Sequence, residues 1–347
     1  MALVLVLGAA LWAFGAAIKA PIRARLIMLG LLYVAVLALQ IAMPQGHPIR
    51  EATGGSAGEW LVIGGLGALI WGYAKGLGRL KEHVRPENQP KTPSQSSSVE
   101  LDRNARHIVL REIGGPGQKR LKQAHVLVIG AGGLGSPALQ YLAAAGVGTI
   151  GVIDDDVVEN SNLMRQVIHT DARIGMPKVF SAEQAMKEQN PFVTIRPYHR
   201  RLTADIADDL FADYDLILDG TDDTATRYLV NETAVRAKLP LISAAISQWE
   251  GQISVFDPSR GAPCYKCVFP EPAAEGLAPT CAEGGVLGPL PGILGTMMAA
   301  EAIKFLADAG TPLLGRLFIY DALYAEARVI KVQRRTDCPV CSQYQSA

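Results

Sequence analysis

The chain has 347 residues, of which 49% are apolar and 19% charged, and this composition excludes disorder as its general state. The net charge of +0 is an average, because residues 1–100 carry 9 basic and 5 acidic side chains and residues 101–347 carry 24 and 28. A negative C-terminal part without a basic run argues against binding of nucleic acid. Five cysteines, an odd number late in a long chain, exclude the disulfide framework of a small secreted protein.

The first 80 residues hold most of the apolar excess. A membrane-spanning helix needs about 20 apolar residues, and two long uncharged runs meet this need while a third is shorter. We therefore predict a membrane region over residues 1–80 with about three transmembrane helices, at 2–18, 26–43 and 58–75. A soluble helical hairpin is an alternative. A cleaved signal peptide is another, but no charged segment precedes the first run.

Basic residues predict the orientation of this region. Lys19, Arg23 and Arg25 follow the first run, and four more basic residues follow the third. Because basic loops stay in the cytoplasm, we expect a multi-pass protein of the inner (plasma) membrane whose C-terminal part faces the cytoplasm. Residues 81–100 include three prolines and a serine cluster, which is typical of a linker before a domain at 101–347.

The start of this domain has the pattern of a nucleotide site. A β-branched run at 126–129 leads into glycines at 130, 132 and 135 and then into a helical pattern. Such glycines let the backbone turn tightly and approach a phosphate. A second strand at 149–153 ends in Asp154, which is placed to bind a ribose hydroxyl. A nicotinamide dehydrogenase and a tight turn without a ligand remain alternatives at this point.

Further strands are expected at 193–197, 216–218 and 240–244, with helical stretches between them. Those at 252–256, 317–320 and 328–332 lack long crossovers and are typical of antiparallel hairpins. The fold class is therefore α/β, with a Rossmann-like, doubly wound and mostly parallel sheet that continues into antiparallel strands.

The cysteines add a metal site. Cys264 and Cys267 form one C-x-x-C pair, and Cys338 and Cys341 form another. Four thiolates complete a tetrahedral Zn²⁺ site that has no open position, so we expect a structural zinc ion; two redox pairs are the alternative. The remaining Cys281 is either a buried small side chain or a nucleophile in a polar loop.

These features together resemble the HesA/MoeB/ThiF family of ubiquitin-activating-enzyme-like adenylyltransferases over residues 101–345. The segments that carry the resemblance are the arginine segment at 106–108, the glycine loop at 130–135, D-x-D at 154–156, S-N-L-M-R-Q at 161–166, G-M-P-K at 175–178, D-G-T-D at 219–222, E-G-Q at 250–252 and both C-x-x-C pairs. A dehydrogenase does not require this set.

The resemblance implies a reaction in which the C-terminal Gly-Gly carboxylate of a small ubiquitin-like sulfur carrier attacks the α-phosphate of ATP, giving an acyl-adenylate and pyrophosphate. Arg165 and Lys178 would stabilise the developing charge, Asp222 would hold Mg²⁺, and Arg106 would reach into the partner's site of a homodimer. The implied nucleotide-binding set is Gly130, Gly132, Gly133, Gly135, Asp154, Asp156, Ser161, Asn162, Leu163, Met164, Arg165, Lys178, Asp222 and Asp223.

Two positions depart from the family pattern, because Asn104 replaces a common tyrosine and Asp223 replaces a usual asparagine. The favoured carrier is the small subunit of molybdopterin synthase, in molybdenum cofactor biosynthesis. The thiazole sulfur carrier of thiamine biosynthesis is the alternative, and in that branch a cysteine matching Cys281 takes part in sulfur transfer. A catalytically inactive membrane-anchored scaffold is an alternative of another class. We expect a separate protein to donate the sulfur, since the sequence ends six residues after Cys341.

Overall fold

A computed structural model describes residues 2–18, 22–54, 56–66, 69, 72–73, 97–272 and 284–344. The chain divides into two compact units, Met1–Ser94 and Gln95–Ala347, and each is described by itself.

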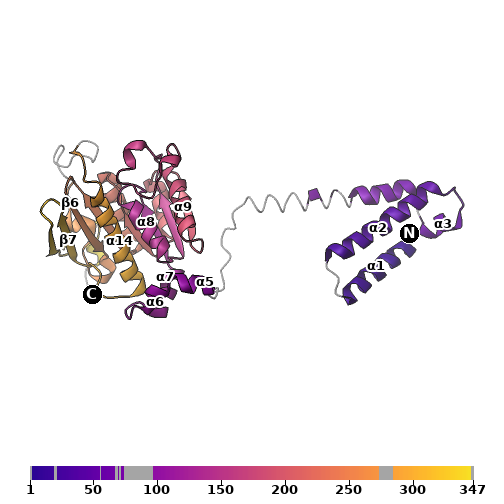
Figure 1. Ribbon diagram of the computed structural model, residues 1–347, viewed down its shortest axis with the longest axis horizontal. Coiled ribbons are helices and arrows are strands. Elements are labelled where there is room, and N and C mark those ends of the chain that lie inside the picture. Colours follow the sequence, from indigo (N-terminus) through magenta and orange to yellow (C-terminus); the bar gives the residue numbers. More distant parts are fainter. Residues whose placement is uncertain are drawn as a thin grey trace. The chain divides into compact units, whose positions relative to one another are not determined.

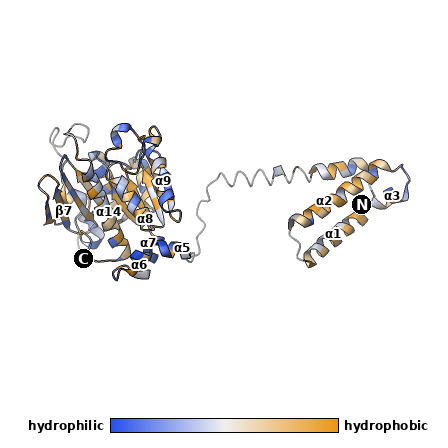
Figure 2. Ribbon diagram, viewed as in Figure 1, coloured by the Kyte–Doolittle hydropathy of each residue, from blue (hydrophilic) through white to orange (hydrophobic). Residues whose placement is uncertain are grey.

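The N-terminal unit is helical. It contains α1 (Ala2–Ala17), α2 (Ile22–Ala42), α3 (Pro48–Thr53) and a further helical stretch over 57–66. Val4, Val36 and Trp60 form a small buried cluster. Most other large apolar side chains of these helices are exposed, and α1 and α2 are coloured mostly as hydrophobic in Figure 2. An exposed apolar surface of this kind is characteristic of a segment that contacts lipid or another protein.

Within the described residues, the structure does not bear out all three expected membrane-spanning helices. In this unit the described residues include one helix that is long and apolar enough, Ala24–Ala42, of which 11% is buried. Helix α1 has 16 residues and is too short. The third predicted span, 58–75, is helical over 57–66 and lies partly outside the described residues. The second helix of sufficient length, Pro289–Ala307, belongs to the other unit and is half buried, as a core helix is.

The C-terminal unit is built on one eight-stranded sheet, with strand order β3-β2-β1-β4-β5-β6-β7-β8 (Figure 1). Strands β1 to β5 pair in parallel, whereas β6, β7 and β8 are antiparallel, which confirms the predicted change of direction. The expectation that no long crossover joins the later strands was wrong for β6 and β7, because a helix of 19 residues, Pro289–Ala307, lies between them. The strands are β1 (His125–Ile129), β2 (Thr149–Ile153), β3 (Thr194–Tyr198), β4 (Leu216–Asp219), β5 (Leu241–Ile246), β6 (Glu250–Phe256), β7 (Arg316–Asp321) and β8 (Glu326–Lys331).

Helices connect the parallel strands. The crossover helices are α8 (Gly135–Ala144), α9 (Lys178–Gln189), α10 (Ala204–Phe211) and α11 (Thr224–Ala237), preceded by α5 (Ser98–Arg103), α6 (Ala105–Val109) and α7 (Gly114–Gln123) and followed by the short α12 (Tyr265–Val268) and the long α14 (Pro289–Ala307). Alternate residues of β1 face opposite layers: Val126 and Val128 pack in the core that includes α8, α9 and α14, and Leu127 and Ile129 pack in the core that includes α10 and α11.

The strand order reverses between β1 and β4. The chain runs outward from β1 to β3 and then returns to the other side of β1. In doubly wound sheets the loops at the carboxyl ends of the strands diverge at such a point and leave a crevice for a ligand. The fold therefore places the loops after β1 and β4 at the expected position of a binding site.

Candidate active site

A cleft of about 870 Å³ opens at the carboxyl ends of β1, β2 and β4. Most of the residues expected to bind nucleotide line it, although they come from five separate segments of the chain. The predicted residues in its wall are Gly130, Gly132, Gly133, Asp154, Asp156, Asn162, Arg165, Lys178, Asp222 and Asp223. The fold therefore brings the glycine loop, several carboxylates and the predicted cations Arg165 and Lys178 to one cavity.

The glycine loop turns more tightly than a side chain would permit. Gly130 has φ +90°, a conformation that only glycine adopts readily. A Cβ on Gly135 would lie 1.9 Å from the carbonyl oxygen of Gly130, and a Cβ on Gly133 would lie 3.0 Å from Pro291 at the start of α14. By contrast, a Cβ on Gly132 would meet no atom closer than 3.9 Å. Gly130 and Gly135 therefore shape the turn, while Gly132 leaves room beside it.

Asp154 is held in place by the loop that it faces. Its Oδ2 accepts a hydrogen bond from the backbone N–H of Ala131 at 2.8 Å, and its Oδ1 accepts one from the N–H of Asp156 at 2.9 Å. Burial raises the pKa of this carboxyl, and the nearby Lys178 ammonium opposes the shift. The carboxylate is thus oriented at the carboxyl end of β2.

Lys178 and Arg165 are two of the five basic residues that line the cleft, with Arg200, Arg201 and Arg227, and they have partners of different kinds. Lys178 is buried at the first residue of α9, and its Nζ lies 2.7 Å from Asp156 Oδ2. The guanidinium of Arg165 donates to the backbone oxygen of Ser161 at 3.0 Å. Both side chains can exchange these contacts for contacts with an anion, and cations with such freedom suit a phosphate site.

The adjacent carboxylates Asp222 and Asp223 differ in their surroundings. Asp223 is the N-cap of α11, where its Oδ2 accepts a hydrogen bond from the N–H of Thr226 at 2.9 Å. The Thr226 hydroxyl bond and Arg201 both lower the pKa of Asp223. Asp222 is exposed at the wall of the cleft. Aspartate and asparagine both cap helices well, so the aspartate at position 223, where the family usually has asparagine, still caps α11.

A buried ion pair that the sequence motifs did not predict lies at the cleft, where Arg227 is part of the wall. Asp219 Oδ2 accepts a hydrogen bond from Ser243 Oγ at 2.8 Å and lies 3.5 Å from Arg227 Nη1. Arg227 also donates to the carbonyl oxygens of Thr221 and Ala244. A signal was present, because Arg227 lies three positions before Val230 on the buried face of α11. Asp219 therefore supports the loop that carries Asp222.

Sequence analysis also missed His169, which is buried beside the glycine loop and contacts the carbonyl oxygen of Ala131. A single histidine between two motifs has no spacing pattern from which its contact with the loop could be predicted. Gln166, the last residue of the S-N-L-M-R-Q segment, lines the cleft as well, as do Tyr265 and Phe269.

Several predicted residues lie elsewhere. Gly135 starts α8 behind the loop, and Arg106 is an exposed residue of α6. Neither lines the cleft within the described part of this chain, and the same holds for Ser161, Leu163 and Met164. Cys281 lies outside the described residues.

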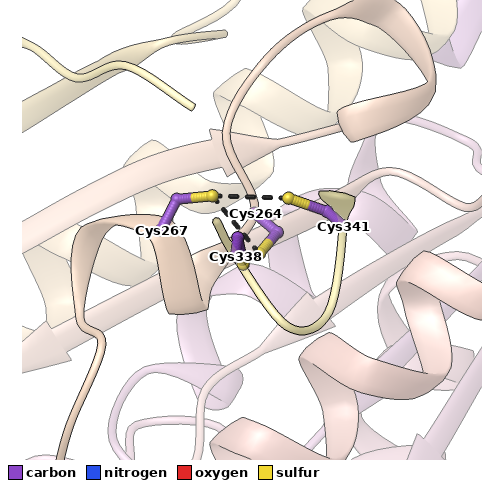
Figure 3. Close-up of side chains that lie close together, drawn as sticks. All are labelled: Cys264, Cys267, Cys338 and Cys341. Atoms are coloured by element: carbon purple, nitrogen blue, oxygen red, sulfur yellow. Dashed lines mark hydrogen bonds between the residues drawn. The ribbon is translucent and has the colours of Figure 1, made fainter. Parts of the chain in front are cut away.

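The four paired cysteines form a separate buried cluster (Figure 3). The Sγ atoms are 3.8 Å apart for Cys264 and Cys267, 3.6 Å for Cys264 and Cys338, and 3.4 Å for Cys267 and Cys341. Four sulfurs around a tetrahedral zinc ion at about 2.3 Å would be about 3.8 Å apart. The backbone N–H of Arg335 also points to Cys267 Sγ at 3.4 Å. The donor set and its spacing therefore fit a zinc ion that ties the C-terminal segment to the loop before α12.

The fold and the cleft together are those of Rossmann-like nucleotide-binding proteins. The family model of the ThiF family matches residues 104–340. The chain belongs to the ThiF family.

Curated relatives and solved structures agree with this assignment. The chain is 48% identical over 246 residues to a sulfur carrier protein adenylyltransferase of Thermus thermophilus, which covers 70% of this chain and 91% of that protein. It is 49% identical over 249 residues to the probable adenylyltransferase/sulfurtransferase MoeZ of Mycobacterium tuberculosis, covering 71% of this chain but only 64% of MoeZ. Since its relatives are adenylyltransferases, the chain is an enzyme of the adenylyltransferase class, which uses ATP.

A crystal structure of Escherichia coli MccB with ATP has a TM-score of 0.58 and 24% identity, and the match covers 65% of this chain and 69% of MccB. This likeness supports the fold.

Proposed function

We propose that this enzyme adenylylates the C-terminal Gly-Gly carboxylate of a small ubiquitin-like sulfur-carrier protein. The carboxylate oxygen attacks the α-phosphorus of ATP, the bond to the bridging oxygen breaks, and pyrophosphate leaves with both bonding electrons. One observation carries the proposal: the glycine loop, Asp154, Arg165, Lys178 and Asp222 share one cleft in a chain of the ThiF family.

The chemistry of the cleft supports these roles. Two anions must meet in the reaction, so cations must offset their repulsion. Arg165 and Lys178 are two of the cations in the wall, and each has a partner, the Ser161 carbonyl oxygen or Asp156, that a phosphate oxygen can replace. Asp154 is oriented at the end of β2, where a ribose hydroxyl would lie in a nucleotide bound across the loop.

A magnesium ion would arrive with the triphosphate, and we propose that Asp222 is its protein ligand. Mg²⁺ prefers oxygen ligands and binds through one or two carboxylates together with substrate phosphates. Asp222 is an exposed carboxylate in the wall, whereas the neighbouring Asp223 Oδ2 is engaged in the helix cap.

The carrier that we favour is the small subunit of molybdopterin synthase, and the thiazole sulfur carrier is the second candidate. The relatives named above support a sulfur carrier as the substrate class and do not separate these two. A structural zinc ion at the cysteine cluster and a homodimer that shares Arg106 between subunits complete the proposal. The apolar helices of the N-terminal unit would anchor the enzyme to the inner membrane, with the C-terminal unit in the cytoplasm.

The test is ATP–pyrophosphate exchange by the full-length chain in mild detergent, with each carrier added separately. Exchange with one carrier alone supports the adenylation chemistry and identifies the pathway. A carrier that lacks its last two glycines is the matched control, because it keeps the folded surface but presents no diglycine carboxylate. If folded, zinc-loaded enzyme that binds ATP exchanges pyrophosphate with neither carrier, the proposed substrates are wrong and the scaffold alternative gains support.

A further inference from the structure

His169 lies between the glycine loop and helix α9. Its side chain is buried, with 5% exposed. One ring nitrogen, Nε2, is 3.0 Å from the carbonyl oxygen of Ala131, and the other, Nδ1, is 2.9 Å from the hydroxyl oxygen of Ser181. The ring therefore bridges two segments that both border the cleft.

The hydrogen-bond partners fix the tautomer of the ring. A carbonyl oxygen can only accept, so Nε2 carries the proton and donates it to Ala131. Nδ1 then accepts from the Ser181 hydroxyl. Burial lowers the pKa of His169 to about 4, and the nearby charges of Lys178 and Arg173 act in the same direction. The ring is thus neutral at neutral pH, which matches this pattern of one donor and one acceptor.

The hydrogen bond from His169 acts on Ala131, a residue of the glycine loop. Ala131 lies between Gly130 and Gly132, and its N–H donates to Asp154 Oδ2 at 2.8 Å. Its carbonyl oxygen is bound by His169 at 3.0 Å and, at a longer 3.4 Å, by the Ser136 hydroxyl, so side chains hold both backbone polar atoms of Ala131. A glycine-rich loop is flexible by composition, so such external contacts decide its conformation before a ligand arrives.

The second half of the bridge reaches the helix that carries Lys178. Ser181 is on α9, three residues after Lys178 and fully buried. The path from Ala131 through His169 to Ser181 therefore sets the loop relative to the first turn of this helix.

We propose that His169 is a positioning residue that fixes the glycine loop relative to Lys178. The backbone N–H groups of the loop and the Lys178 ammonium can then bind the same polyphosphate. The inference rests on the proposed use of this cleft for ATP. It goes beyond it by assigning a role to a side chain that does not line the cleft in the described part of the chain.

The test measures ATP affinity by calorimetry with the full-length chain in the absence of any carrier. His169→Phe keeps most of the volume and removes both hydrogen bonds. His169→Gln places an amide N–H near the position of Nε2 and retains the bond to Ala131. We expect His169→Phe to weaken ATP binding about tenfold, which corresponds to about 1.4 kcal/mol, and His169→Gln to recover most of the loss. Ser181→Ala removes only the second half of the bridge and is expected to weaken binding by a smaller factor.

Asn190→Ala is the matched control. Asn190 follows α9, is 1% exposed, and makes two hydrogen bonds: it donates to the carbonyl oxygen of Ala143 in α8 at 2.7 Å and accepts from the N–H of Phe192 at 3.2 Å. Its loss removes buried hydrogen bonds away from the cleft, so the melting temperature should fall while ATP affinity stays unchanged.

Wild-type affinity in both His169→Phe and Ser181→Ala would overturn the proposal, as would an equal loss of affinity in Asn190→Ala. If His169→Phe does not fold, Ser181→Ala and His169→Gln decide the matter by the same comparison. Enzyme that binds ATP but exchanges no pyrophosphate with either carrier would reject the proposed function alone, whereas wild-type chain that fails to bind ATP would reject both.

Discussion

Lys178 and Asp156 form an ion pair at 2.7 Å across the mouth of the cleft, with the lysine buried and the aspartate largely exposed. The pair joins the first residue of α9 to the loop after β2. A buried ammonium needs a counter-ion, and the aspartate supplies one until a more highly charged anion replaces it. The ion pair therefore holds a cation inside the cleft in the absence of a ligand, at the position where the proposed function requires a phosphate contact.

Lys178→Met should remove this cation while keeping the length of the side chain. We expect the rate of ATP–pyrophosphate exchange to fall by about 100-fold or more, since transition-state charge stabilisation of this kind is worth about 3 kcal/mol. The matched control is Lys187→Met on the same helix, where Lys187 pairs with Glu183 at 2.7 Å but is exposed. Equal rates in the two variants would contradict the role of Lys178.

Asp222→Asn should abolish exchange at ordinary Mg²⁺ concentrations, because a neutral amide is a poor magnesium ligand. Raising the Mg²⁺ concentration should restore part of the rate. Asp223→Asn is the comparison variant. Because asparagine also caps a helix, α11 keeps its N-cap, and we expect the exchange rate to fall by less than about threefold. A Mg²⁺ titration of both variants measures the difference, and an unchanged Mg²⁺ requirement in Asp222→Asn would remove the metal role.

Gly135→Ala should be far more damaging to stability than Gly132→Ala. The new Cβ at 135 would lie 1.9 Å from the carbonyl oxygen of Gly130, whereas the one at 132 has free space out to 3.9 Å. We expect the free energy of unfolding to fall by about 3 kcal/mol or more in Gly135→Ala, because the backbone must move, and by about 1 kcal/mol or less in Gly132→Ala. Urea unfolding followed by fluorescence checks the order, which a similar loss in the two variants would contradict.

Removal of zinc should destabilise the C-terminal segment. The purified chain should contain one zinc ion, and Cys338→Ser should lower both the metal content and the melting temperature. Elemental analysis and a thermal melt test this, with Cys281→Ser as the control cysteine outside the cluster. Full thermal stability after complete chelation would show that the cluster does not act as a structural zinc site.

Much of the fold follows from local patterns in the sequence. Short runs of β-branched and other apolar residues predicted the strands, and their order with intervening helices predicted the parallel part of the sheet, because both depend on neighbouring residues alone. The C-x-x-C spacing likewise predicted the cluster that the structure forms, since each pair already sits on one short turn. The membrane region was harder, because apolar length and composition do not by themselves establish a spanning helix. The half-buried core helix α14 meets the same criteria.

What the sequence determined by itself is the set of local elements: the strands, the glycine turn, the paired cysteines and the motifs of the family. The tertiary structure decided which residues share a site. It brought Asp154, Lys178 and Asp222 to one cleft, left Arg106 outside the cleft of its own chain, gave Asp223 a helix to cap, and placed His169 against a loop 38 residues earlier. The physical reason is that these contacts form where the strand order of a doubly wound sheet reverses. At that point loops from distant parts of the sequence meet, and no short stretch of sequence contains them together.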